Sequence, residues 1–285
     1  MTIERAKNVG PAKIDVAYER IGEGEPLVLV MGLGAQLIAW PDGFCEHLVA
    51  RGYSVIRFDN RDAGESTHMT GTPDLAAALR GDFSTVTYTL SDMAADTVGL
   101  LDALGIERAR FVGASLGGFV AQTIAIEYPE RISALTSIMS STGARDVGQP
   151  SAGTAAALFV GGSPRTREES IARAVDAARL IGSPAYPPDL EAVAARAGRS
   201  YDRGFDPPAF ARQGAATLAS GDRTAKLRQI SLPTTVVHGA ADRMVDPSGG
   251  RATAAAIPGA KLEIIDGMGH DLPRALWPRI VDLVA

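Results

Sequence analysis

A serine between two glycines, in the pentapeptide Gly113-Ala114-Ser115-Leu116-Gly117, constrains the fold of this chain more than any other feature. An apolar run, residues 110–112, precedes it, and a segment of helical character, residues 118–128, follows it. A G-x-S-x-G motif between a strand and a helix is typical of a sharp turn that exposes a serine hydroxyl as a nucleophile. Glycines two residues before and after the serine let the strand and the helix approach closely. The motif predicts a nucleophilic Ser115; the alternative is a glycine-rich turn with a bystander serine.

The rest of the chain alternates between strand and helix patterns. Residues 27–31 are apolar throughout, which suits a strand that is covered on both faces, as in a parallel sheet. Similar strands are expected at residues 13–20, 53–58, 132–139, 232–238 and 261–265. Helices are expected between them at residues 41–50, 91–104 and 248–256. This alternation predicts an α/β fold with a mostly parallel sheet flanked by helices.

The alternation stops in the second half of the chain, where helix signals follow each other without a strand. Thr166 and Glu169 form the spacing of a capping box, and Asp206-Pro207 pairs an N-cap residue with a proline at the first helical position. Helices alone, inserted into an α/β chain, predict a lid. We therefore expect a core in two parts, residues 1–142 and 225–285, with a helical lid at residues 143–224.

A nucleophilic serine needs a general base from another strand end. His270 lies in a glycine-rich loop directly after the last expected strand, on the side of the sheet where Ser115 emerges, so it is the preferred base. His238 lies at a strand terminus and His47 on a helix, while His68 follows a polar loop. These three histidines suit packing or solvation better than catalysis.

The acid that orients His270 should follow a third strand, where Asp242 and Asp246 are both available. Asp246 precedes Pro247 and resembles a helix N-cap, whereas Asp242 lies in a turn of small residues that leaves its carboxylate free. Asp266 and Asp271 flank the histidine too closely to point at it. The predicted triad is Ser115, Asp242 and His270, which is the chain order of the α/β-hydrolases.

Composition excludes several classes of function. The net charge of −5 argues against a nucleic-acid partner, because phosphate binding needs clustered Lys and Arg. Cys45 is the only cysteine, so the chain forms no internal disulfide, and the four histidines lack metal-ligand spacing. We expect no metal and no cofactor. An N-terminus without a signal-peptide core and the lack of a membrane-length apolar stretch predict a cytoplasmic protein, and whether it forms a homo-oligomer stays open.

Two stretches, residues 31–44 and 55–66, are similar to the aclacinomycin methylesterase branch of the α/β-hydrolase superfamily and to related actinobacterial esterases and lipases. The superfamily resemblance extends over the whole chain. It implies a serine esterase that cleaves carboxylic esters without a cofactor. It also implies an oxyanion hole made by the backbone N–H groups of Leu33 and Leu116.

The chain departs from the pattern of these esterases at two places beside the predicted oxyanion hole. Met31-Gly32 stands where many members have His-Gly, and Leu116 stands where many have methionine. Because both oxyanion donors are backbone groups, the hole should survive these changes. The altered side chains change the shape of the pocket, so the substrate of a relative does not transfer directly.

Proteins with other functions share this fold, and some of them share the catalytic triad. A serine nucleophile argues against epoxide hydrolases and haloalkane dehalogenases, whose members of this fold use an aspartate. A perhydrolase, a carbon–carbon hydrolase and an acyltransferase share the triad and remain alternatives. So does a ligand-sensing or interaction module on the same fold, because a fold does not determine a function.

The large apolar side chains of the lid, mainly Leu, Ile, Phe and Tyr, favour a neutral, largely apolar small-molecule ester as substrate. A charged acyl group would lose its hydration without a dedicated partner. Arginines of the lid could provide such a partner, but on alanine-rich helices we expect most of them to be solvated. They are Arg165, Arg167, Arg173, Arg179, Arg196, Arg199, Arg203 and Arg212.

Overall fold

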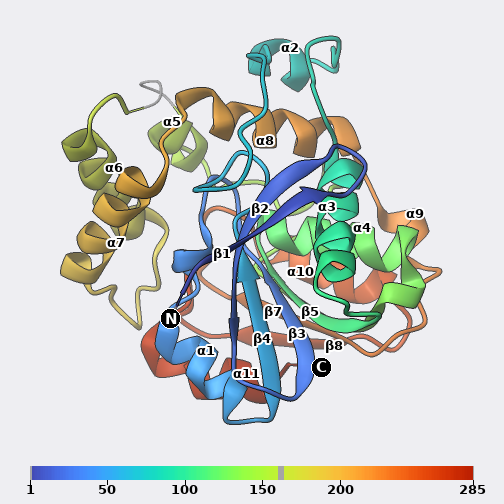
Figure 1. Cartoon of the computed structure of the whole chain (residues 1–285). Coiled ribbons are helices and arrows are strands. Elements are labelled where there is room, and N and C mark those ends of the chain that lie inside the picture. Colours follow the sequence, from blue (N-terminus) through green and yellow to red (C-terminus); the bar gives the residue numbers. More distant parts are fainter. Residues whose placement is uncertain (1, 160–163, 285) are drawn as a thin grey trace.

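An eight-stranded sheet runs through the computed structural model, which describes residues 2–159 and 164–284 (Figure 1). Its strands are β1 (Glu4–Val9), β2 (Ile14–Ile21), β3 (Glu25–Val30), β4 (Tyr53–Phe58), β5 (Ala109–Ala114), β6 (Ile132–Ile138), β7 (Thr234–Gly239) and β8 (Lys261–Ile265). They lie in the order β1-β2-β4-β3-β5-β6-β7-β8. β2 pairs antiparallel with β1 and β4, and the neighbours from β4 to β8 pair in parallel. The predicted mostly parallel sheet is confirmed.

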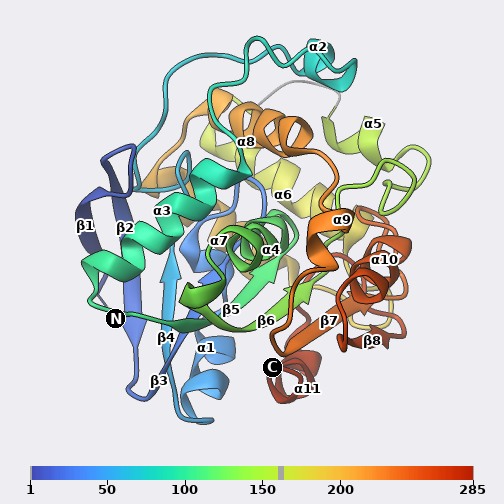
Figure 2. The ribbon, with the colours of Figure 1, turned by 90° about the vertical axis from the view of Figure 1, so that its right-hand side faces the viewer.

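Helices cover both faces of the sheet (Figures 1 and 2). Those that pack on it are α1 (Asp42–Val49) and α11 (Trp277–Asp282) on one face, and α3 (Leu90–Ala103), α4 (Leu116–Glu127) and α10 (Ser248–Ala256) on the other. The remaining short elements are α2 (Leu75–Leu79), α9 (Thr224–Leu227) and the single turns Leu37–Ala39, Pro129–Arg131 and Arg274–Leu276.

β3 is buried on both faces of the sheet, as its continuous run of apolar residues predicts. Val28 and Val30 belong to the core under α3 and α4, whereas Leu27 and Leu29 belong to the core under α1 and α11, and all four are fully buried. Successive side chains of a strand point to opposite faces, so a strand buried on both sides must be apolar at every position. Because the strands from β3 to β8 pair in parallel, the carboxyl ends of β3, β5, β7 and β8 lie at the same edge of the sheet.

Among the described residues, the segment predicted as a lid contributes four helices that follow β6 and precede α9. They are α5 (Thr154–Phe159), α6 (Arg167–Ile181), α7 (Leu190–Arg203) and α8 (Pro207–Ser220). α6 and α7 pack side by side, and α8 crosses the top of the molecule (Figure 1). The backbone N–H of Arg223 donates to the carbonyl of Thr142 at 2.9 Å, so both ends of the segment meet. We retain residues 143–224 as the proposed extent of the lid.

The expectation that most lid arginines are solvated is wrong for the two that anchor the lid. Arg212 of α8 donates to both carboxylate oxygens of Asp62 at 2.6 and 2.9 Å, and Asp62 and Arg212 are almost fully buried. Arg203, at the end of α7, pairs with the buried Asp59 at 2.8 Å. Burial of ionised groups is tolerated only with partners, which the polar loop after β4 supplies. Four of the eight arginines are exposed, namely Arg165, Arg167, Arg179 and Arg199.

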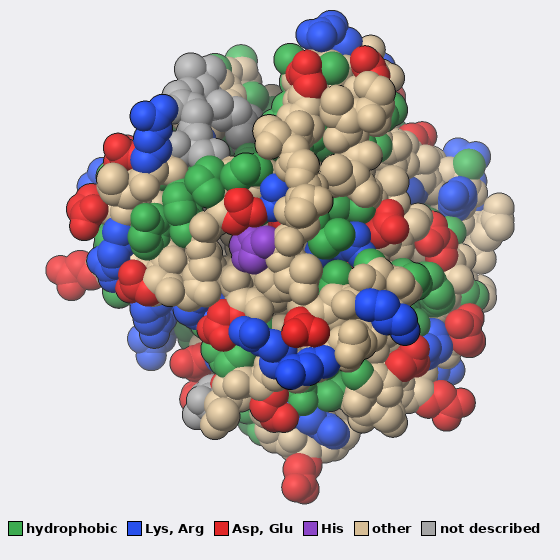
Figure 3. All heavy atoms as spheres, turned by 45° about the horizontal axis from the view of Figure 1, so that its top comes forward, with side chains coloured by type: hydrophobic (Ala, Val, Ile, Leu, Met, Phe, Trp, Pro, Cys, Tyr) green, Lys and Arg blue, Asp and Glu red, His purple; other side chains and the backbone are tan. Residues whose placement is uncertain are grey.

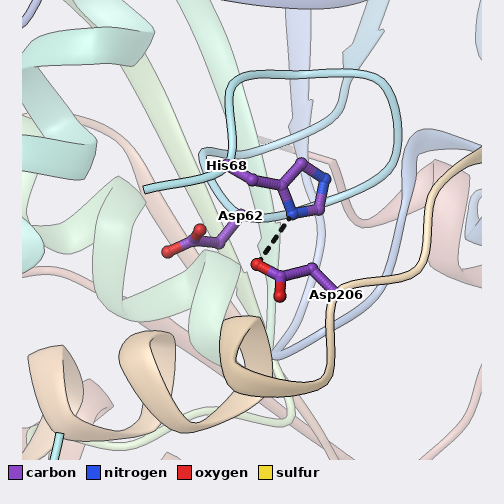
Figure 4. A group of neighbouring side chains, drawn as sticks. All are labelled: Asp62, His68 and Asp206. Carbon is purple, nitrogen blue, oxygen red and sulfur yellow. Dashed lines mark hydrogen bonds and ion pairs between the residues drawn. The ribbon is translucent and has the colours of Figure 1, made fainter. Parts of the chain in front are cut away.

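The Arg212 anchor contains a group of residues that resembles a metal site. The ligand atoms of Asp62, His68 and Asp206 lie within 4.8 Å of one another, and Nδ1 of His68 lies 3.2 Å from Asp206 (Figure 4). The guanidinium of Arg212 bonds both carboxylates, however, so their charge is already compensated. The predicted N-cap Asp206 makes no capping bond and uses its carboxylate here instead. The arrangement fits an ion-pair network that holds the lid, and the expectation of no metal stays a prediction.

Replacing Arg212 should therefore cost more stability than replacing any exposed lid arginine. We expect Arg212→Met to lower the free energy of unfolding by about 3 to 5 kcal/mol, because it leaves the buried Asp62 without its cation. Arg179→Met is the matched control, since Arg179 is exposed and, among the described residues, pairs only with Asp176 on its own helix, a contact that contributes less than about 0.5 kcal/mol. Urea unfolding of both variants tests this, and equal losses would contradict the anchor.

Candidate active site

Ser115 occupies the strained turn that its motif predicts. It follows β5 directly and has φ 55° and ψ −119°, a backbone conformation that L-residues rarely adopt. A Cβ atom on Gly113 would lie 2.2 Å from the carbonyl oxygen of Gly117, and one on Gly117 would lie 1.9 Å from that of Val30. Only glycine fits at either place. The two glycines thus let α4 start directly against the ends of β5 and β3, with Ser115 at the turn.

His270 and Asp242 lie in line with Ser115. Nε2 of His270 is 3.1 Å from Oγ of Ser115, and Nδ1 is 2.8 Å from Oδ2 of Asp242. The three side chains come from the ends of β5, β7 and β8, which the parallel sheet brings to one edge. The structure brings these three side chains together, although they are up to 155 positions apart in the chain.

The Asp242 carboxylate is held as an anion. Its other oxygen, Oδ1, accepts the N–H groups of Met244 and Val245 at 2.8 and 2.9 Å. Burial by itself raises the pKa of this carboxyl, but hydrogen bonds from His238 and His270 outweigh burial and hold the pKa at about 2. Asp242 is therefore charged at neutral pH and can keep a proton on Nδ1 of His270, which leaves Nε2 free to accept one.

The competing residues have other roles in the structure. Asp246 accepts the N–H of Ser248 at 2.9 Å at the start of α10, although the helix begins one residue later than its proline suggests. Asp271 accepts the hydroxyl of Ser183, and burial raises the pKa of its carboxyl. His238 is fully buried, and its Nε2 lies 2.8 Å from the carbonyl of Val245 and 3.4 Å from Oδ2 of Asp242, so it contacts the candidate acid and not Ser115.

His47 and His68, in contrast, contact none of the three candidate triad residues in the described part of the chain. His47 lies on α1, which packs beside α11 (Figure 1). His68 contacts Asp206 in the lid anchor. Neither histidine competes with His270 for contact with Ser115.

Leu33 and Leu116 carry the two backbone N–H groups predicted as oxyanion donors. Leu116 is the first residue of α4, so its N–H has no partner within the helix. Leu33 follows Gly32, whose added Cβ would lie 3.2 Å from Cβ of Ser115. In the described ranges neither N–H donates a hydrogen bond. Unused backbone donors close to a nucleophilic serine can stabilise a developing oxyanion.

The lid also forms hydrogen bonds with the loop that carries His270. The sequence does not predict this contact. The N–H of His270 donates to the carbonyl of Ile181 at 2.7 Å, and that of Gly269 donates to Oγ of Ser183 at 2.8 Å. Ser183 is almost fully buried. A serine between glycine and proline reads as an ordinary loop residue, so only the tertiary structure reveals this contact.

Family membership follows from comparison with known proteins. A model described as the alpha/beta hydrolase fold matches residues 25–273, so the chain belongs to the α/β-hydrolase family. Rhodomycin D methylesterase DnrP of Streptomyces peucetius is 32% identical over 281 residues, covering 88% of this chain and 86% of that protein. The 3-oxoadipate enol-lactonase 2 of Acinetobacter baylyi is 27% identical over 261 residues, with coverage of 88% and 86%.

A solved structure agrees with this assignment. A hydrolase from Pseudomonas aeruginosa superposes with a TM-score of 0.75 at 27% identity, covering 100% of this chain and 98% of the other. The fold and the resemblance to methylesterases that the sequence predicts are confirmed.

Proposed function

We propose that the chain hydrolyses neutral carboxylic esters through an acyl-enzyme on Ser115. His270 takes the hydroxyl proton as the serine oxygen attacks the ester carbonyl, and the N–H groups of Leu33 and Leu116 stabilise the oxyanion. The intermediate collapses, and the departing alcohol receives the proton from His270. Water, activated by the same histidine, then attacks the acyl-enzyme and releases the acid.

One observation carries this proposal: the Ser115, His270 and Asp242 side chains are in hydrogen-bond contact at one edge of the sheet, with two unused backbone donors beside the serine. Two relatives, a methylesterase and an enol-lactonase by name, cleave ester bonds and support a carboxylic ester hydrolase. In the described part of the chain no helix is long and apolar enough to cross a membrane. Acidic and basic side chains are interspersed on the face that Figure 3 shows, which agrees with a small-molecule partner better than with nucleic acid.

The preference for neutral substrates rests on the lid arginines. Arg203 and Arg212 are engaged by Asp59 and Asp62, so they are not free to bind a substrate carboxylate. Arg196 of α7 differs from these two. It is half-buried, burial lowers its pKa, and among the described residues no carboxylate lies within ion-pairing distance of it. Arg196 is thus a lid residue that a charged substrate could use as a partner.

A panel of paired substrates tests the proposed class. We expect kcat/KM for a neutral p-nitrophenyl or methyl ester to exceed that of the isosteric monoester with a free carboxylate by at least about tenfold, because the charged group loses hydration on binding. Comparable values for the two esters would contradict a neutral pocket. The comparison of Arg196→Gln with Arg199→Gln, its exposed neighbour on α7, would then show whether Arg196 binds the carboxylate.

The remaining alternatives are separated by simple measurements. Formation of peracid from hydrogen peroxide, cleavage of a carbon–carbon bond, or acyl transfer to an added alcohol would identify the other reactions of this triad. A ligand-sensing module with a disabled site would not react with a fluorophosphonate, whereas the proposed esterase should be labelled at Ser115.

A further inference from the structure

The lid touches the loop that carries the Leu33 donor. We call residues 32–37, which follow β3, the oxyanion loop. Its Gly34 N–H donates to Oε1 of Gln213 in α8 at 2.8 Å. Further along the loop, the Gln36 amide donates to the carbonyl of Ser200 in α7 at 2.7 Å and accepts from Arg203 at 2.6 Å. Two lid helices therefore hold one catalytic loop through hydrogen bonds.

Both the oxygen and the nitrogen of the Gln213 side-chain amide form hydrogen bonds at this contact. Its side chain is fully buried, and Nε2 donates to the carbonyl of Arg61 at 2.8 Å while Oε1 accepts from Gly34. Reversing the amide would break both bonds, so its orientation is determined by its partners. Arg61 lies in the core loop after β4, which is itself fixed by a pair between Arg61 and Asp96. Gln213 thus joins the oxyanion loop to a rigid part of the core.

The oxyanion loop needs such a restraint. Leu33 stands between Gly32 and Gly34, and glycines leave the neighbouring backbone free to rotate. Gly34 has φ +68°, and a Cβ on it would lie 2.8 Å from the ring of Phe210, one turn before Gln213 in α8. The loop is therefore packed by one residue of α8 and hydrogen-bonded by the next residue on the same face.

We propose that Gln213 is a positioning residue for the oxyanion hole: by holding Gly34 it directs the N–H of Leu33 toward the oxygen that becomes negative in the transition state. This inference rests on the proposed function, since it assigns Leu33 as a donor. Donors act in catalysis only when they are already oriented before charge develops. Loss of the Gln213 contact should accordingly affect the transition state more than substrate binding.

The test variant is Gln213→Met, which keeps the length of the side chain and removes both hydrogen bonds. We expect kcat to fall about 10- to 100-fold, less than the loss of an entire donor, with KM within about threefold of the wild type. A boronic acid, which adds to the serine and places an oxygen in the hole, should bind more weakly by a similar factor. A non-hydrolysable ether analogue of the substrate should bind unchanged.

Two further variants separate positioning from general damage. Gln122→Met is the matched control, because Gln122 is also fully buried and makes two side-chain hydrogen bonds, to Ser137 and Arg223, away from the oxyanion loop. It should retain kcat within about threefold. Gln213→Glu should retain more activity than Gln213→Met, because a buried carboxyl stays protonated and can reproduce both bonds. Its activity relative to the wild type should fall as the pH rises and the carboxyl ionises.

The outcomes distinguish this inference from the proposed function. An active Ser115→Ala variant would remove the basis for both. If Ser115→Ala is inactive, a Gln213→Met variant with unchanged kcat would overturn the positioning role alone. So would an equal loss of affinity for the boronic acid and the ether, because that result indicates a damaged pocket rather than a misdirected donor.

Discussion

Ser115→Ala should abolish ester hydrolysis and leave the fold intact. The hydroxyl is the group that attacks the substrate, and loss of the serine in a well-studied triad lowers kcat by about 10⁶-fold. The strain at this position belongs to the backbone, which has φ 55° and is held by Gly113 and Gly117. Alanine adopts the same turn at the same cost, so the free energy of unfolding should change by less than about 1 kcal/mol. Hydrolysis of p-nitrophenyl esters and urea unfolding measure the two effects.

Labelling with a fluorophosphonate provides the control for this variant. The wild-type chain should be labelled and Ser115→Ala should not, which also excludes a contaminating hydrolase as the source of activity. Full activity in the purified variant would exclude Ser115 as the nucleophile. Loss of activity together with loss of the folded state would instead indicate a structural role for the hydroxyl.

Most of the fold could be predicted because its signals are local. The strands 53–58 and 261–265 and the helix 248–256 begin and end where the sequence predicts. Their residues follow simple rules: continuous apolarity for a buried parallel strand, and turn residues at the boundaries. β1 was missed because its alternation is weak: in Glu4–Val9 only Val9 is buried. α2, a five-residue helix between loops, gives too short a pattern to recognise.

The grouping of the three candidate triad residues follows from the topology of the sheet. Residues after the carboxyl ends of parallel strands meet at one edge of the sheet, so Ser115, Asp242 and His270 become neighbours once the strands are recognised. The choice of Asp242 over Asp246 rested on a capping argument. In the structure the carboxylate of Asp246 accepts the N–H of Ser248, and that of Asp242 contacts Nδ1 of His270.

The contacts of the lid with the core could not be predicted in the same way. Arg212 and Gln213 lie on the buried face of α8 together with Ala209 and Ala216, at the helical spacing of an apolar stripe. That spacing was the available signal, and polar residues on such a stripe indicate buried partners. Their partners, Asp62 and Gly34, lie 150 and 179 residues away in loops. Loop positions follow from tertiary packing, which periodicity does not encode.

Asp242→Asn should reduce kcat far more than Asp246→Asn, although the two residues are four positions apart. Asparagine at 242 keeps an oxygen for the N–H groups of Met244 and Val245 but turns an amide N–H₂ toward Nδ1 of His270. The imidazole then carries its proton on Nε2, the atom that must accept the proton of Ser115. The same change in a well-studied triad costs about 10⁴-fold in kcat, which is the loss expected here.

Asparagine at 246 can still accept the N–H of Ser248, so helix α10 should lose only a few tenths of a kcal/mol and kcat should stay within about twofold. This variant is therefore the control for the charge change. Steady-state kinetics of both variants with one p-nitrophenyl ester provide the measurement. Because Asp242 is the carboxylate in contact with His270, the reverse ranking would mean that the loop after β7 rearranges before catalysis and brings Asp246 to the base.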